Sequence, residues 1–246
     1  MALPLKEWLD TPEVKRFQAM SVKEAGHEYF FRNPPRTAWG NRELFASPAD
    51  GVITTQGRFH PDEDLIEVKG VKVTVNKILG PHAIERPALV TCIFMTAADV
   101  HWNRAPTDVT MARHPLPPIR TLNQPMLWAE RNMLDMGLIR KGTFGFMNGN
   151  ARVVNRCFYG ALQYRYYLVQ IADSEINCIV PIKAQPVATF NQNERFGQII
   201  WGSMCVLILP LDVRYRFKPL CQVADHVEAT VDPLFKVNCG KKELRK

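Results

Sequence analysis

The succession of β-strand patterns after residue 40 constrains the fold of this chain more than any other feature. Short apolar or alternating runs recur with turn residues between them, and one helix-length pattern, at residues 125–136, interrupts them. Parallel sheets need a crossover between successive strands, so this order disfavours a βαβ winding. The body of the protein is therefore predicted to be β-rich.

A β-hairpin is predicted over residues 66–75, where valine and isoleucine alternate with other residues around a Lys69-Gly70 turn. Further strands are expected wherever β-branched, aromatic and other apolar residues form short runs, at residues 89–95, 164–171, 176–182, 204–209 and 213–217. Residues 142–150 contain glycines but match neither a dinucleotide-binding motif nor a P-loop. We interpret them as a loop.

The first forty residues have a different pattern. Apolar residues recur there at helical spacing, Thr11-Pro12-Glu13 is typical of a helix start, and Ser21 with Glu24 fits a capping box. We predict short amphipathic helices that pack on the body of the protein, with docking on a membrane surface as the alternative. Residues 32–40 contain two adjacent prolines and are interpreted as a linker. The chain then divides into a helical extension with linker, 1–40, and a main domain, 41–246.

The composition is typical of a soluble globular protein, with 46% apolar and 22% charged residues. No run of about 18 uncharged apolar residues occurs, and charges interrupt the N-terminus where a signal peptide is apolar, so we expect a cytoplasmic protein. The net charge of +7 favours an anionic partner, whether phospholipid surface, nucleic acid or metabolite. The six cysteines form no C-x-x-C pair, and we expect no metal site.

Three separated segments carry the residue types of a reactive site. Residues 47–53 read Ser-Pro-Ala-Asp-Gly-Val-Ile, residues 99–106 read Asp-Val-His-Trp-Asn-Arg-Ala-Pro, and residues 196–206 contain Gly202-Ser203. Taken singly, each segment has a structural explanation: a β-turn, a hydrogen-bonded histidine after a strand, and a bend that enters a strand. We therefore interpret the segments together, by their order and separation.

As an ordered set, these segments resemble the phosphatidylserine decarboxylase family. The resemblance extends from about residue 46 to residue 212, with weaker matches at residues 71–80 and 130–132. It implies an α+β fold with a β-rich core of barrel-like or hybrid antiparallel sheets, which agrees with the strand patterns. It also implies that residues 41–246 are a decarboxylase-like catalytic domain that cuts its own backbone between Gly202 and Ser203.

Self-cleavage in this family yields the prosthetic group. The resemblance implies that the Ser203 hydroxyl attacks the carbonyl of Gly202 to form an ester, and that elimination and hydrolysis leave a pyruvoyl group at residue 203. Glycine before the serine keeps that carbonyl accessible. The attack needs a base, an orienting carboxylate and donors for the oxyanion, as a serine, histidine and aspartate triad does. By similarity, the carboxylate is Asp50.

A pyruvoyl group implies a carboxy-lyase. Its carbonyl forms a Schiff base with the amine of an amino-acid head group and takes up the electrons that carbon dioxide leaves behind, as pyridoxal phosphate does in other enzymes. The substrate is expected to be phosphatidylserine or a related amine, with a free amino acid as an alternative. His101 matches the first histidine of the family motif, which implies that it protonates the carbanion or positions the carboxylate.

Arg104 stands where the family usually has a second histidine, the base of the triad. Arginine stays protonated at neutral pH and does not take a proton from a serine in the ordinary way. Three alternatives remain open: His101 is the base for processing, strain and the charge of Arg104 allow a slow cut, or the protein does not mature. Arg104 itself is interpreted either as an ion-pair partner of Asp50 or as a binding group for a substrate carboxylate or phosphate.

We favour the decarboxylase over a non-cleaving pseudoenzyme that binds a lipid, a metabolite or a protein. Nucleic-acid binding is not expected, because the basic and aromatic residues 152–167 suit a half-buried strand better than a base-stacking surface. A homo-oligomer and peripheral association with an anionic membrane both stay open. The remaining histidines are interpreted as surface residues: His27, His60, His82, His114 and His226.

Overall fold

The computed structural model describes residues 2–21, 24, 31–37, 39–68, 71–118, 150–172, 179–200 and 204–239. Its α-helices are short: α1 (Leu5–Leu9), α2 (Pro12–Gln18) and α4 (Val75–Leu79), with 3-10 turns at Gly80–His82 and Gly160–Leu162. The predicted helix at 125–136 and all but the last residue of the predicted loop at 142–150 lie outside these ranges.

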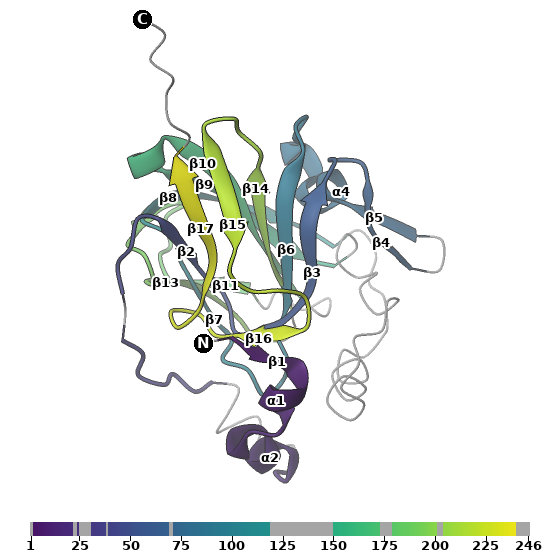
Figure 1. Ribbon diagram of the computed structural model, residues 1–246, viewed down its shortest axis with the longest axis vertical. Helices are drawn as coiled ribbons and strands as arrows, with labels where there is room; N and C mark the ends of the chain where they lie inside the picture. The colour runs from purple at the N-terminus through teal and green to yellow at the C-terminus, as the bar shows by residue number, and fades with distance from the viewer. Residues whose placement is uncertain are drawn as a thin grey trace, which may run out of the picture.

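Strands are the main secondary-structure elements of the described chain (Figure 1). In chain order they are β1 (Leu3–Pro4), β2 (Leu44–Ala46), β3 (Gly51–Phe59), β4 (Asp64–Val68), β5 (Val71–Thr74), β6 (Ala88–Phe94), β7 (Trp102–Arg104), β8 (Val109–Leu116), β9 (Arg152–Tyr159), β10 (Tyr164–Ile171), β11 (Ile179–Pro181), β12 (Val187–Phe190), β13 (Arg195–Ile199), β14 (Met204–Pro210), β15 (Tyr215–Pro219), β16 (Asp225–Val227) and β17 (Pro233–Cys239).

Nine strands form one antiparallel sheet in the order β1-β16-β3-β6-β14-β10-β9-β8-β12. Three smaller sheets, β11-β13-β7, β15-β17-β2 and β4-β5, complete the described part of the fold. The β-rich, antiparallel expectation is confirmed, but the barrel-like one is wrong for this part of the chain. In the described chain no pairing joins the edge strands β1 and β12, so the large sheet is open. Its two faces are covered by smaller sheets and helices.

The central strands of the large sheet are buried on both faces. On β6, Cys92 and Phe94 face one apolar cluster, which includes residues of α1, α4 and β5, while Ile93 faces a second cluster with residues of β2 and β17. On β14, Val206 and Leu207 divide between the two clusters in the same way. Strands covered on both sides are apolar at nearly every position, which is why β14 is a continuous apolar run and β6 has only Thr91 as a polar residue.

The local predictions fit with small corrections. The hairpin forms as β4 and β5, but Val75, expected in its second strand, begins α4, because the Thr74 side chain caps that helix by accepting a hydrogen bond from the Lys77 amide at 3.2 Å. Thr11 caps α2 with Pro12 at its first position, as predicted. In the part of the chain that the structure describes, no helix has the length and apolar character needed to cross a bilayer.

The N-terminal helices lie at one end of the large sheet (Figure 1). β1 pairs with β16, and the buried side chains of Leu5, Trp8 and Val14 join the apolar cluster on that face of the sheet. Burying these side chains favours packing on the body over exposure to solvent. The extension therefore lies beside β16, the strand that adjoins β3 and the site described next.

Candidate active site

Asp50 lies at the end of the large sheet where β3 begins. Gly51, the first residue of β3, has a φ of 147°, and a Cβ atom there would lie 2.2 Å from the carbonyl oxygen of Phe94. Only glycine fits such a position. Val52 pairs with Phe94, and Phe94 pairs with Met204 at the start of β14. The Asp50-Gly51 pair therefore brings a carboxylate to the end of the sheet at which β14 begins.

The carboxylate of Asp50 forms a buried, bidentate ion pair with Arg36. Nη1 of Arg36 donates to Oδ1 of Asp50 at 2.6 Å, and Nη2 donates to Oδ2. The backbone amide of Ala229 donates to the same Oδ1 at 2.8 Å, while the Ala229 carbonyl accepts from Arg36 at 2.7 Å. Burial disfavours the charge of Arg36, but the hydrogen bond and the charge of Asp50 outweigh it and raise the pKa of the guanidinium.

Arg36 belongs to the segment that the sequence led us to interpret as a linker. A second arginine of this segment, Arg32, donates to the carbonyl oxygens of Ala98 at 2.6 Å and Asp99 at 3.5 Å. Residues 31–37 thus bond to both loops that hold the predicted site, the one before β3 and the one before β7. Sequence reasoning missed this function, because the two adjacent prolines led us to interpret the segment as a linker, and only its arginines signal otherwise.

His101 is fully buried just before β7. Its Nδ1 lies 2.9 Å from the carbonyl oxygen of Asp99. A carbonyl only accepts, so Nδ1 carries the hydrogen and Nε2 has the lone pair of the neutral ring. Burial lowers the pKa of His101 to about 4, against the opposing effects of the Asp99 carbonyl and of the Asp99 and Asp50 charges. The ring is therefore a neutral, Nδ1-protonated imidazole at pH 7.

His226 was predicted to be a surface residue, and this prediction is wrong. The side chain is buried, with Nε2 2.7 Å from Oδ1 of Asp99 and its ring stacked on Trp8 at 4.0 Å between centroids. Burial disfavours the Asp99 carboxylate, but the charge and hydrogen bond of His226 and the bonds from Thr96 outweigh it and lower the pKa of Asp99. His27 lies outside the described residues.

Arg104 does not pair with Asp50, so that interpretation is wrong. Asp50 is bonded to Arg36 instead, and Nη1 of Arg104 donates to the carbonyl oxygen of Asn193 at 3.0 Å. The Arg104 backbone amide donates to Pro48 at 2.9 Å, which joins β7 to the loop that carries Asp50. Burial and the charges of Arg36 and Arg195 lower the pKa of Arg104, and Asp50 partly offsets them. The two predicted residues are near each other without direct contact.

A buried amide network holds β7 against the large sheet. Nε2 of Gln170, on β10, donates to Oδ1 of Asn103 at 2.8 Å, and Oε1 of the same glutamine accepts from Asn155, on β9, at 3.2 Å. A Cβ atom at Gly197 would lie 2.9 Å from Gln170 Nε2, so glycine leaves room for the network. These bonds hold β7 against β10, while strand pairing joins β7 to β13, and together they fix the backbone beside His101 and Arg104.

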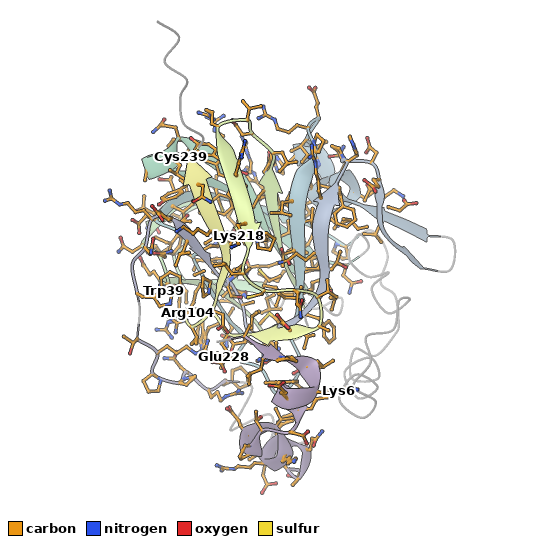
Figure 2. All side chains as sticks on the ribbon, in the orientation of Figure 1. Lys6, Trp39, Arg104, Lys218, Glu228 and Cys239 are labelled. Carbon is orange, nitrogen blue, oxygen red and sulfur yellow. The ribbon has the colours of Figure 1, made fainter. Side chains whose placement is uncertain are left out.

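Glu228 adds a carboxyl group that the sequence did not single out. It precedes Ala229, whose backbone bonds to both members of the Asp50–Arg36 pair. Burial and the charge of Asp50 raise the pKa of Glu228. Figure 2 shows Glu228 and Arg104 on the part of the body that adjoins the N-terminal helices.

Gly202 and Ser203, the predicted cleavage pair, lie outside the described residues, but the residue that follows them does not. Met204 is fully buried and pairs with Phe94 on one side and Ile171 on the other. A group at the N-terminal end of β14 is therefore attached to a strand that is held on both sides.

Comparisons with known proteins identify the family of the chain. The family model described as phosphatidylserine decarboxylase matches residues 27–234. The chain belongs to the phosphatidylserine decarboxylase family. The match includes the segments with Asp50, His101 and Gly202-Ser203, and it also includes Arg36. Members of this family are carboxy-lyases made as zymogens, and they act in phospholipid metabolism.

Several curated members of the phosphatidylserine decarboxylase family are similar to most of this chain, and each is named phosphatidylserine decarboxylase proenzyme. The protein of Ralstonia nicotianae is 27% identical over 83% of this chain and 75% of its own length. The protein of Beijerinckia indica is 27% identical over 76% of this chain and 65% of its own length. The protein of Geotalea daltonii is 26% identical over 76% of this chain and 70% of its own length.

Proposed function

We propose that this protein is a pyruvoyl-dependent decarboxylase that cuts itself between Gly202 and Ser203 and acts on phosphatidylserine or a related amine-bearing substrate. The observation that carries the proposal is the burial of a neutral His101 and of an Asp50 paired with Arg36, near the end of the sheet where β14, the strand that follows Ser203, begins. Membership of a family of carboxy-lyases made as zymogens supports the reaction type.

We assign the proton transfers to His101. Arg104 is a poor proton acceptor, whereas the neutral imidazole of His101 has its lone pair on Nε2. In the cut, that nitrogen accepts the hydroxyl proton of Ser203. In turnover, the same nitrogen would accept a proton from the substrate ammonium and deliver it to the substrate carbon after carbon dioxide leaves.

Asp50 acts through its charge. Both of its carboxylate oxygens are occupied by Arg36, and one also accepts from Ala229, so the carboxylate is held in one orientation. That charge raises the pKa of His101 against the larger effect of burial, which means that it stabilises the imidazolium when His101 takes a proton. Arg36 is then the residue that positions Asp50.

The chemistry that a pyruvoyl group at residue 203 supplies is an electrophilic carbonyl able to hold a substrate amine and accept an electron pair. The paired strands around Met204 support its position. In this proposal residues 41–246 are the catalytic domain and residues 1–40 the extension. The net charge of +7 favours an anionic lipid surface as the place where the protein binds its substrate.

The experiment is a decarboxylation assay on the purified full-length chain. Release of labelled carbon dioxide is measured from phosphatidylserine in mixed micelles, from L-serine and from L-tryptophan, with Ser203→Ala as the matched variant that has no hydroxyl to rearrange. We expect release from phosphatidylserine by the wild type, loss of that release after treatment with phenylhydrazine, and background release by Ser203→Ala.

Two outcomes separate the alternatives. Release from a free amino acid but not from phosphatidylserine would keep the enzyme and change its substrate. An uncut wild-type chain that releases no carbon dioxide from any of the three compounds would contradict the proposal and favour the non-cleaving pseudoenzyme.

A further inference from the structure

One face of the small sheet β11-β13-β7 carries a set of buried and half-buried side chains beside the candidate site. Trp102 on β7 lies opposite Gln198 on β13, and Arg104 lies opposite Arg195. Residues directly opposite in an antiparallel pair share a face, and so do residues two apart on one strand. Trp102, Arg104, Arg195 and Gln198 therefore lie together. We call this group the donor face.

The donor face offers nitrogen–hydrogen donors that find no acceptor in the described part of the chain. Nε1 of Trp102, Nε of Arg104 and Nε2 of Gln198 are all buried from solvent, and each lacks a hydrogen-bond partner among the described residues. A buried donor without an acceptor costs free energy, so three of them on one face need an explanation. A ligand group that only accepts hydrogen bonds, such as an oxyanion, would satisfy all three donors.

The charges of the donor face point to the same kind of group. Two arginines stand directly opposite each other, an arrangement that is unfavourable without an anion between them. Within the described residues neither forms an ion pair: Arg195 lies over the Trp102 ring at 4.8 Å, and Arg104 bonds to a carbonyl. The neighbouring carboxylates are already engaged, Asp50 by Arg36 and Glu194 by Lys183 at 2.9 Å.

We infer that the donor face is an oxyanion-binding subsite, which holds the phosphodiester of the substrate while its amine reacts near His101. This inference rests on the proposed function and deepens it. Planar guanidinium groups bind phosphate oxygens through paired hydrogen bonds, and the amide and indole donors complete such a set. The subsite adjoins the reacting centre, because β7 begins directly after His101 and the Ile199 amide donates to the His101 carbonyl at 3.2 Å.

The alternative oxyanion is the substrate carboxylate, and the chemistry disfavours it. That carboxylate leaves as carbon dioxide, so its negative charge disappears from the group as the reaction proceeds. Two guanidinium groups bonded to it would stabilise the ground state more than the transition state and slow the reaction. A phosphodiester keeps its charge throughout, so binding it holds the substrate without opposing the chemistry. The subsite thus favours an amino acid carried on a phosphate over a free amino acid.

The test measures binding to the full-length Ser203→Ala chain by calorimetry, so that its result does not depend on self-cleavage. The probes are glycerophosphoserine, glycerophosphoethanolamine, L-serine and inorganic phosphate. We expect the two glycerophosphodiesters to bind with similar affinity and L-serine to bind at least about tenfold more weakly. Inorganic phosphate should compete with both diesters. If inorganic phosphate binds but neither diester does, the donor face is a site for a free anion. That result would overturn its assignment as the subsite for the substrate phosphodiester.

Arg104→Gln and Arg195→Gln should each weaken diester binding by about ten- to a hundredfold, and Arg216→Gln, an exposed arginine on β15, should leave it unchanged. The far-ultraviolet circular dichroism of each variant shows whether it folds, and either arginine variant alone suffices. Unchanged binding in a folded variant would overturn the inference, as would L-serine binding as tightly as the diesters. If the wild type does not cleave itself but the Ser203→Ala chain binds the diesters, the result contradicts the proposed function and supports the subsite.

Discussion

Arg36 and Asp50 show what a single pair of residues contributes to this site. Both side chains are almost fully buried, with 8% and 2% of their surface exposed, and the pair is bidentate. Removal of one member of such a pair leaves the other charge buried without its partner, which costs more than the intact pair contributes. The positions of Asp50 and of residues 31–37 therefore depend on each other.

Arg36→Gln should lower the free energy of unfolding by about 3–5 kcal/mol, measured by urea denaturation, because it leaves the Asp50 carboxylate without its counter-charge. Arg42→Gln, at an exposed position, is the control and should stay within about 0.5 kcal/mol of the wild type. The double variant Arg36→Gln/Asp50→Asn should be less destabilised than the sum of the single variants. Additive losses would contradict the pairing.

His101 should make the protein sensitive to mild acid. Its pKa is about 4 in the folded chain and about 6.5 when unfolded. Between these values the unfolded chain takes up a proton that the folded chain excludes, so stability falls as the pH drops from 6.5 to 4, by up to about 3 kcal/mol. In His101→Gln this part of the pH dependence should be missing, while His60→Gln, at an exposed position, should keep it. Parallel stability curves for the wild type and His101→Gln over this range would show that burial does not hold the ring neutral.

At the scale of elements, the start of β3 depends on one glycine. Gly51→Ala would place a Cβ atom against the Phe94 carbonyl in a backbone conformation that alanine rarely adopts. We expect a loss of about 2–4 kcal/mol in the free energy of unfolding and slower self-cleavage, since Asp50 would move. Gly160→Ala is the matched control, because nothing lies within 4 Å of its added Cβ atom. Equal effects of the two substitutions would refute the close approach of β3 and β6.

The sequence predicted secondary-structure elements better than it predicted which side chains bond to each other. The strand predicted at residues 164–171 has these bounds in the structure, because its aromatic and β-branched residues suit a sheet whatever lies opposite. His226 was misplaced, because its burial depends on Asp99, a residue 127 positions away. Arg36 was missed because it lies in a segment with two adjacent prolines that was interpreted as a linker. The motif segments contain Asp50, His101 and the Asp99 carbonyl that bonds to His101, while the partners of Asp50, Arg36 and Ala229, come from segments with no motif.

At the scale of the whole molecule, a cut before residue 203 would leave two interwoven chains. The smaller chain would hold β14, which lies between β6 and β10, together with β16 and β17, which pair with β3 and β2. Its apolar residues belong to both clusters of the core. The two chains should therefore co-elute on size-exclusion chromatography and separate only in denaturant. Release of the smaller chain under native conditions would contradict this arrangement of strands.

The central claim is that this chain converts Ser203 into a carbonyl group by itself, consuming one water and releasing one ammonia. The most direct measurement is the intact mass of freshly purified, untagged protein beside its Ser203→Ala variant. The account predicts two polypeptides for the wild type, residues 1–202 and 203–246, with the smaller lacking a free amino terminus and lighter than the unmodified fragment by the loss of an amine. The variant should remain one chain of 28.1 kDa less one oxygen atom. A wild type that stays a single chain under the same conditions would contradict the account.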